Sequence, residues 1–344
     1  MIKLIIIGFG NLAKSFVKIL SNLKKGHKRA VLFPKIGPYE LTDMSIVNIF
    51  DIQKSLVEKS LIEIIPNLHD LCRDIKILPG VLLDPIPKML SRKIITKIVD
   101  SSSFERSLNN IDADIAILAI NSFARKSALF YAQKLAAKGI SLINATPIKI
   151  ACEREIVEMF RKNNAIIVGD YIRGYFDPWV FKLILRDVID WLGLSVSEFH
   201  EMEFIGGVEG GSLIEPETRR QMLSKLRDVI SNIYSAAESV SSSYDWQYFL
   251  KNFRSYQSII HIKDPLENLI EMHVHLRWSS SHSSALLLFD VIRAVKLALD
   301  KGYCGRVDEI CNYGFLFNTK KFSIKPFSAI LDDFKQFITS LSLQ

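Results

Sequence analysis

The first twenty residues constrain the fold more than any other stretch. An apolar, mainly β-branched run over 2–7 stops at Gly8-Phe9-Gly10, and apolar residues then recur at helical spacing, at Leu12, Phe16 and Leu20. The pattern predicts a strand, a glycine turn and a helix, with Ala13 at the small-residue position of G-x-G-x-x-G/A. Such a turn lets the backbone approach a pyrophosphate, and the helix N-terminus supplies free N–H groups and a positive dipole end. Because many βα turns contain glycine without binding anything, the motif needs a second signal.

An acidic residue supplies that second signal. Asp51 ends a second apolar run over 46–50, where a carboxylate accepts hydrogen bonds from the ribose hydroxyls of a dinucleotide. A carboxylate there repels a 2′-phosphate, so the expected cofactor is NAD rather than NADP. Asp51 follows Gly8 at more than twice the usual separation of about 20 residues, so residues 24–43 are interpreted as an insertion.

A regular alternation of strands and helices follows. Apolar strands are predicted at 114–120, 140–145 and 165–168, with helices at 122–138 and 153–162. Parallel strands joined by crossover helices form a doubly wound sheet, whose ligands lie at the carboxyl ends of the strands. The candidate cofactor-binding residues at these ends and at the glycine turn are Gly8, Gly10, Asn11, Leu12, Asp51, Asn121, Asn144, Thr146 and Asp170.

The pattern changes at about residue 195. A strand at 199–205 and a long amphipathic helix at 216–237 precede two alternating strands, 258–263 and 270–278, which predict a hairpin. The predicted fold class is α/β, a doubly wound Rossmann-type parallel sheet with an inserted α+β substrate and oligomerisation domain. We expect a dinucleotide-binding domain at 1–194, the insert at 195–279, and a return helix and tail at 280–344 that complete the first domain. A helix after Asp51 as far as about 65 and loops at the serine triplets 101–103 and 241–243 are also expected.

Composition excludes several classes of protein. The net charge is +7, yet no nucleic-acid motif or basic patch interleaved with aromatic residues occurs. No apolar run reaches the ~18 residues of a membrane helix, and the N-terminus lacks a signal-peptide pattern. The four cysteines show no paired or metal-finger spacing, which favours a reducing cytoplasm. We therefore expect a cytoplasmic protein that binds neither nucleic acid nor membrane.

A set of motifs is spread over nearly the whole length of the chain: Gly8-Phe9-Gly10-Asn11-Leu12-Ala13, Gly37-Pro38-Tyr39, Ile143-Asn144-Ala145-Thr146-Pro147, Ile167-Val168-Gly169-Asp170 and Asp290-Val291-Ile292-Arg293-Ala294-Val295-Lys296. In these motifs the chain resembles the inositol-phosphate synthase family, particularly its archaeal and bacterial branch. The resemblance implies an isomerase that uses NAD to convert glucose 6-phosphate to inositol phosphate by oxidation, enolisation, aldol cyclisation and reduction. It also implies a homotetramer assembled through the sheet of the insert.

The family's four lysines are only partly kept. Its K-x-x-S-K motif reads Gln221-Met222-Leu223-Ser224-Lys225, and its G-D-D-x-K motif reads Gly169-Asp170-Tyr171-Ile172-Arg173. The lysine before the hairpin corresponds to Lys251 or, less well, to Tyr256, and Lys320 and Lys321 follow the return helix. The resemblance assigns catalysis to Lys225, Asp170, Arg173 and Lys251, and binding of the sugar phosphate to Arg173, Lys225 and Lys320. The simpler alternatives are an exposed helical Lys225 and an Asp170 that caps the helix starting near Pro178.

These departures leave three functions open: the synthase reaction, an NAD-dependent oxidoreductase acting on another phosphorylated sugar or polyol, and a non-catalytic NAD-binding paralogue. A metal site is a further alternative, since His273 and His275 form a His-x-His pair on the polar face of a strand near His261. No third ligand is fixed by spacing, so no metal is predicted.

Overall fold

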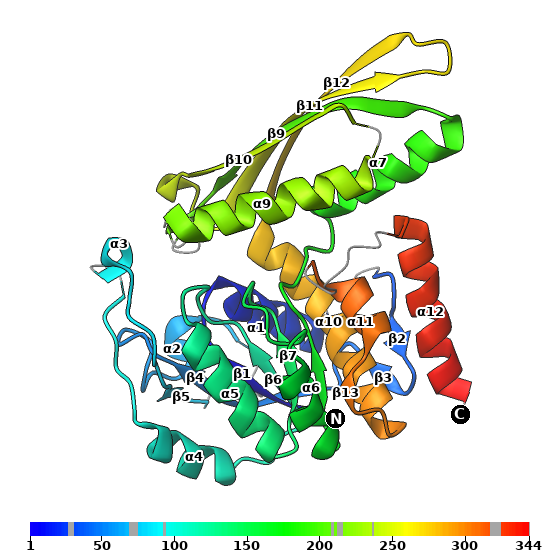
Figure 1. Ribbon diagram of the computed structural model, residues 1–344. Helices are drawn as coiled ribbons and strands as arrows, with labels where there is room; N and C mark the ends of the chain where they lie inside the picture. The colour runs from blue at the N-terminus through cyan, green and yellow to red at the C-terminus, as the bar shows by residue number, and fades with distance from the viewer. Residues whose placement is uncertain are drawn as a thin grey trace. The chain divides into compact units, whose positions relative to one another are not determined.

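The chain divides into two compact units (Figure 1). The computed structural model describes residues 1–26, 31–68, 75–91, 94–207, 210–211, 216–235, 237–316 and 325–343. The first unit comprises Met1–Arg173, Ser284–Asn318 and Asp333–Gln344, and the second comprises Gly174–Ser283 and Thr319–Asp332. In the described part of the chain, no helix combines the length and the apolarity needed to cross a membrane.

A seven-stranded parallel sheet forms the centre of the first unit, as the sequence predicts. Its spatial order is β5-β4-β1-β6-β7-β8-β13, and every neighbouring pair is parallel. The chain runs outward from β1 through β4 to β5 and then returns to the other side of β1 at β6, so the strand order reverses between β1 and β6. The strands are β1 (Ile2–Ile7), β4 (Met44–Asp51), β5 (Ile77–Pro79), β6 (Ile115–Leu118), β7 (Ser141–Asn144), β8 (Ile166–Val168) and β13 (Gly305–Arg306).

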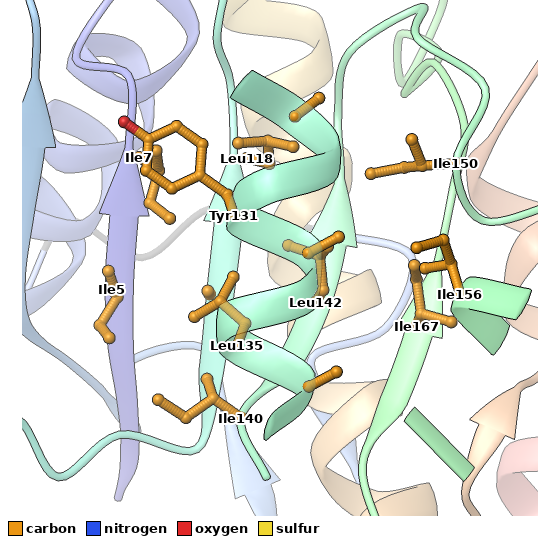
Figure 2. Packing of buried hydrophobic residues seen from close by; sticks show 14 of the residues in the cluster. Ile5, Ile7, Leu118, Tyr131, Leu135, Ile140, Leu142, Ile150, Ile156 and Ile167 are labelled. Carbon is orange, nitrogen blue, oxygen red and sulfur yellow. The ribbon is translucent and has the colours of Figure 1, made fainter. Parts of the chain in front are cut away.

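Helices pack on the sheet because its strands are apolar on both faces. Figure 2 shows α5 lying over the sheet and running along its strands, with Tyr131 and Leu135 packed among Ile5, Leu118 and Leu142. Each such fully buried side chain contributes about 1.5–3 kcal/mol. The helices of this unit are α1 (Asn11–Lys24), α2 (Leu61–Ile64), α3 (Lys88–Ser91), α4 (Ser101–Asn109), α5 (Arg125–Ala137), α6 (Arg154–Lys162), α11 (Asp308–Gly314), most of α10 (Ser280–Asp300) and part of α12 (Phe327–Leu343), with the small hairpin β2 (Lys35–Ile36) and β3 (Tyr39–Glu40).

The second unit is a four-stranded sheet with two helices on one face, as Figure 1 shows. The sheet order is β10-β9-β11-β12, and the predicted hairpin is confirmed as the antiparallel pair β11–β12. Leu183 of α7 and Ile230 of α9 pack against Phe199 and Ile260 of the sheet. The elements are α7 (Pro178–Leu192), β9 (Ser195–Ile205), α9 (Pro216–Ile233), β10 (Ser239–Trp246), the 3₁₀ helix η2 (Tyr248–Leu250), β11 (Phe253–Lys263) and β12 (Leu269–Ser279).

The predicted domain boundaries need correction. We placed the first boundary after residue 194, but α7 belongs to the second unit because its apolar side chains lie in the core of that unit. We also assigned the whole tail to the first domain. Phe327 and Ile330 pack against the second core, and the Ser328 N–H donates to Asp187 Oδ2 at 3.1 Å, so this part of the tail groups with the second unit.

Three local predictions are also wrong. Helix α2 is a single turn, because residues 52–54 pair instead with the distant segment 95–97. The triplet 101–103 begins α4, capped by the Asp100 carboxylate, which accepts from the Ser103 N–H. The triplet 241–243 lies in β10, which pairs in parallel with β9.

Candidate functional site

The glycine turn lies where the strand order of the first sheet reverses. Gly8 follows β1 with φ +96°, a conformation that glycine adopts without strain. Its N–H donates to the Phe50 carbonyl at 2.8 Å, and a Cβ at this position would lie 2.5 Å from the Ala119 carbonyl oxygen. The turn is therefore packed between the ends of β4 and β6. The carboxyl ends of the strands, at the point where the strand order reverses, are where doubly wound sheets bind ligands.

The N-terminus of α1 is open, unlike those of α5 and α7. Gly10 is its N-cap, no side chain caps it, and no acidic residue occupies its first turn. An added Cβ at Gly10 would meet no atom within 4 Å. In contrast, the Asp84 carboxylate accepts from two N–H groups at the start of α5, and Asp177 caps α7. The α1 turn thus offers free N–H groups and space for an anion such as a pyrophosphate.

Asp51 lies beside this turn, at the end of β4. Its Oδ2 accepts the Phe9 N–H at 2.6 Å, and its Oδ1 accepts the Gln53 N–H at 2.7 Å. Burial raises the pKa of Asp51, while these N–H donors and the charge of Lys14 act in the opposite direction. The carboxylate retains acceptor capacity for ribose hydroxyls. The glycines, the open helix end and Asp51 together fit a dinucleotide.

Asn144, Thr146 and Asp170 form a closed hydrogen-bond network at the ends of β7 and β8. Asn144 Nδ2 donates to Asp170 Oδ1 at 2.6 Å and to the Ile148 carbonyl, while its Oδ1 accepts from the Thr146 N–H and hydroxyl. Asp170 also accepts the N–H groups of residues 150 and 151. Burial raises the pKa of Asp170 to about 6, although these hydrogen-bond donors act to lower it.

This network uses all four hydrogen bonds of the Asn144 amide, so a cofactor contact there would come from backbone groups. Asp170 does not cap α7, because Asp177 does. Among the remaining cofactor candidates, Asn11 is exposed, and Leu12 and Asn121 are half-buried. Their roles stay predictions.

The second unit contains a buried charged cluster that the sequence analysis missed. Lys182 Nζ of α7 donates to Glu201 Oε2 of β9 at 2.6 Å, with the two side chains 4% and 6% exposed. Glu201 Oε1 accepts the Ser242 hydroxyl at 2.8 Å, and beside this pair Arg254 Nη1 bonds Glu203 Oε1 at 3.0 Å. The sequence does contain a signal for this cluster: Glu201 and Glu203 are two residues apart and therefore lie on the same face of the strand as Phe199. The buried Lys182–Glu201 ion pair connects α7 to the sheet and is shielded from solvent.

The opposite face of that sheet carries a row of histidines and glutamates across three strands. Glu198 lies 3.0 Å from His261 Nδ1 and 3.4 Å from His200 Nε2, and Glu271 lies 3.0 Å from His261 and 2.6 Å from His273. These hydrogen bonds lower the pKa of Glu271. Within the residues that the structure describes, no three metal-ligating side chains are placed to hold a metal ion.

Comparison with known proteins finds similar sequences that extend over nearly the whole chain. No protein-family model matches the chain. Inositol-3-phosphate synthase of Mycolicibacterium smegmatis is 22% identical over 341 residues, which cover 91% of this chain and 92% of that protein. The chain is thus similar, along nearly its whole length, to proteins named inositol-3-phosphate synthase.

Solved structures support the same fold. A myo-inositol-1-phosphate synthase-related protein from Thermotoga maritima matches with a TM-score of 0.85 at 17% identity, over 98% of each chain. Inositol-3-phosphate synthase of Caenorhabditis elegans matches with a TM-score of 0.76 at 13% identity, over 99% of this chain and 85% of that one. The Rossmann-type α/β fold predicted from the sequence is therefore confirmed.

The structure describes only some of the residues assigned from the synthase family. Arg173, to which the resemblance assigns catalysis and binding of the sugar phosphate, lies in the interior and is 4% exposed. Its Nε donates to the Tyr313 carbonyl at 2.6 Å, and its guanidinium lies 5.1 Å from the Tyr313 ring centroid. Lys251 is exposed, with φ +53° at the end of η2. Lys225 belongs to α9, but its side chain lies outside the described residues, as does all of Lys320. Their catalytic and substrate-binding roles stay predictions.

Proposed function

We propose that this synthase relative is an NAD-dependent isomerase that converts glucose 6-phosphate to inositol phosphate. The observation that carries the proposal is the glycine turn at the reversal of strand order with Asp51 beside it, in a chain similar to a synthase over nearly the whole length of both. The coarser conclusion, a divergent synthase-like protein with a dinucleotide-binding type of fold, does not depend on this activity.

The geometry of the glycine turn supports one assignment of the cofactor-binding residues. The N–H groups at the start of α1 would hold the pyrophosphate, and Asp51 would accept from the adenosine ribose hydroxyls. Bound NAD would supply oxidation of one sugar hydroxyl and return of the hydride after ring closure, so the net reaction is an isomerisation.

The protein must also stabilise an enolate and move protons. Lysine suits both tasks, because burial or a neighbouring cation lowers its pKa toward neutrality. We assign this role to Lys225, with Lys251 and Lys320 as cations for the phosphate. We further propose that the protein is a homo-oligomer, a tetramer in the family pattern, assembled through the uncovered face of the second unit's sheet, where Met202 and Ile259 are exposed. A monomer in light scattering would contradict this assembly.

A second candidate function is an NAD-dependent oxidoreductase acting on another phosphorylated sugar or polyol. The burial of Arg173 favours it, because an arginine whose Nε is bonded to a backbone carbonyl is a poor substitute for a proton-transferring lysine.

The deciding experiment incubates the purified protein, stripped and reloaded with NAD, with glucose 6-phosphate and measures inositol phosphate by chromatography. Formation of inositol phosphate supports the synthase reaction. Reduction of NAD by another sugar phosphate, with no inositol phosphate, supports the second candidate. Tight NAD binding without any turnover would contradict both and would indicate a non-catalytic paralogue.

A further inference from the structure

Strand β12 forms one edge of the second unit's sheet (Figure 1). Among the strands that the structure describes, only β11 pairs with it, so the backbone groups on its outer side have no strand partner in those residues. The strand has eleven residues, contains no proline or lysine, and pairs with β11 over its whole length without a bulge. Lysine, proline and bulges are the devices by which native sheets block pairing at an edge. The edge of β12 is therefore a template on which another strand can form backbone hydrogen bonds.

The apolar side of β12 is also incompletely covered. On the neighbouring strand β11, the inward-facing Ile260 and Ile262 are at most 2% exposed. On β12 the corresponding side chains stay partly exposed, and Ile270 is 44% exposed, although Met272 and Val274 touch the core beneath the helices. A further strand beyond β12 would remove this apolar row from water.

The sequence of β12 is complementary to itself in one antiparallel register, centred on Val274. In that register Glu271 lies opposite the partner's Arg277, and by symmetry Arg277 lies opposite the partner's Glu271. Opposite charges that face one another across two strands attract. On the other side of the strand, apolar residues meet apolar residues: Ile270 opposite Trp278, Met272 opposite Leu276, and Val274 opposite its own copy.

Neighbouring registers lose this match. A shift by one residue places the polar row of one copy opposite the apolar row of the other. Centring the pair on His273 places Leu269 opposite Arg277 and leaves Glu271 opposite a histidine, and centring it on His275 places Arg277 opposite His273. The charges on the strand thus select the register about Val274.

We propose that two copies of this chain associate edge to edge through β12, antiparallel about Val274, so that their two sheets form one continuous sheet. This contact is separate from the face-to-face contact proposed above, and it does not depend on the protein's activity. Glu271 and Arg277 are six residues apart, about 20 Å along the strand, so they cannot pair within one chain. Their pairing therefore requires a second copy.

Both charged side chains can accept this partner. Glu271 bonds His261 at 3.0 Å and His273 at 2.6 Å, and a carboxylate with two such bonds retains lone pairs for a further donor. Arg277 is exposed, and its guanidinium lies 5.1 Å from the centroid of the Phe253 ring. A contact with a ring face does not use the N–H donors, which lie in the guanidinium plane.

The first test is a charge exchange in the full-length protein, followed by sedimentation velocity over a range of concentrations. Glu271→Arg and Arg277→Glu each place like charges opposite one another twice, so each should raise the dissociation constant of this contact at least ten-fold. An equimolar mixture of the two variants places opposite charges in both pairs and should associate within about three-fold of wild type. The double variant Glu271→Arg/Arg277→Glu should associate equally well.

The second test is a disulfide cross-link. Val274→Cys brings two thiols opposite one another at a Cα separation of about 5 Å, which a disulfide spans, so air oxidation should give a covalent dimer on a non-reducing gel. Met272→Cys is the matched control, because its own copy would lie about 14 Å away along the strand and should not cross-link. Val274 is on the side of the sheet that the helices cover, so contact through the uncovered face cannot produce this cross-link.

The other outcomes separate this inference from the proposed function. Wild type that oligomerises, with no cross-link in Val274→Cys and no recovery in the mixed charge variants, overturns the edge contact and leaves both the face contact and the proposed activity standing. Equal cross-linking of Met272→Cys and Val274→Cys overturns the register. Monomeric wild type at every concentration overturns the edge contact together with the proposed homo-oligomer, whereas absence of turnover bears only on the activity. Circular dichroism and thermal unfolding of each variant confirm that it is folded.

Discussion

Replacing Gly8 with alanine is expected to destabilise the first unit and abolish dinucleotide binding. The new Cβ would lie 2.5 Å from the Ala119 carbonyl oxygen and 2.7 Å from its carbonyl carbon, and these are backbone atoms that no rotamer change can move. Overpacking of this kind costs about 1–3 kcal/mol, and the positive φ adds about 1–2 kcal/mol for a residue with a Cβ. The expected loss is therefore about 2–5 kcal/mol, a fall in Tm on the order of 5–15 °C.

Gly10→Ala is the matched control for this prediction. Gly10 has φ −78°, and a Cβ there would meet no atom within 4 Å, so the unfolding free energy should change by less than about 1 kcal/mol. The methyl group would fill the space that a pyrophosphate needs, so the Kd for NAD should rise at least ten-fold. Thermal unfolding and calorimetric titration measure the two effects separately. A Gly8→Ala variant as stable as wild type would refute the packing argument, and a Gly10→Ala variant with unchanged NAD affinity would refute the location of the site.

Three further predictions concern the rest of the molecule. Lys225→Ala should reduce the rate of inositol phosphate formation by a factor of about 10²–10⁴ and leave NAD affinity unchanged. The control Arg227→Ala, at an exposed position of α9, should leave turnover near that of wild type. Normal turnover in Lys225→Ala would show that Lys225 has no catalytic role. Lys182→Ala should lower the free energy of unfolding, measured in urea, by about 3–5 kcal/mol, because it leaves Glu201 buried without its cation. Adding Glu201→Gln to this variant should recover part of the loss. Strictly additive effects of the two substitutions would show that the pair is not coupled. Burial raises the pKa of folded Asp170 to about 6 from 3.8, so the folded state binds this proton more tightly than the unfolded state does. The free energy of unfolding should therefore fall by an amount on the order of 1–3 kcal/mol as pH rises from about 4 to about 6. Urea titrations of Asp170→Asn should show a weaker dependence of the unfolding free energy on pH across this range, and an unchanged dependence would exclude Asp170 as its source.

The candidate site was predictable where its determinants are local. Gly8, Gly10 and Asp51 could be proposed from the sequence because a glycine turn after the first strand and a carboxylate at the end of the second lie at the ligand-binding edge of a parallel α/β sheet. The burial of Arg173, by contrast, depends on Tyr313, which is remote in sequence.

The sequence by itself determined the elements whose pattern of apolar residues lies entirely within one continuous segment. These are the first strand, turn and helix, the later parallel strands, and the hairpin with alternating residues. It could not determine elements that are stabilised by distant partners. The triplet 241–243 is polar and reads as a loop, yet it forms part of β10 because β9 supplies its backbone hydrogen bonds and Glu201 accepts the Ser242 hydroxyl. Residues 52–54 pair with 95–97 instead of forming a helix, and α7 belongs to the second unit because its apolar side chains enter that core. In each case the free energy that stabilises the element comes from contacts that exist only once the chain has folded. Only the tertiary structure therefore decides which element the segment forms.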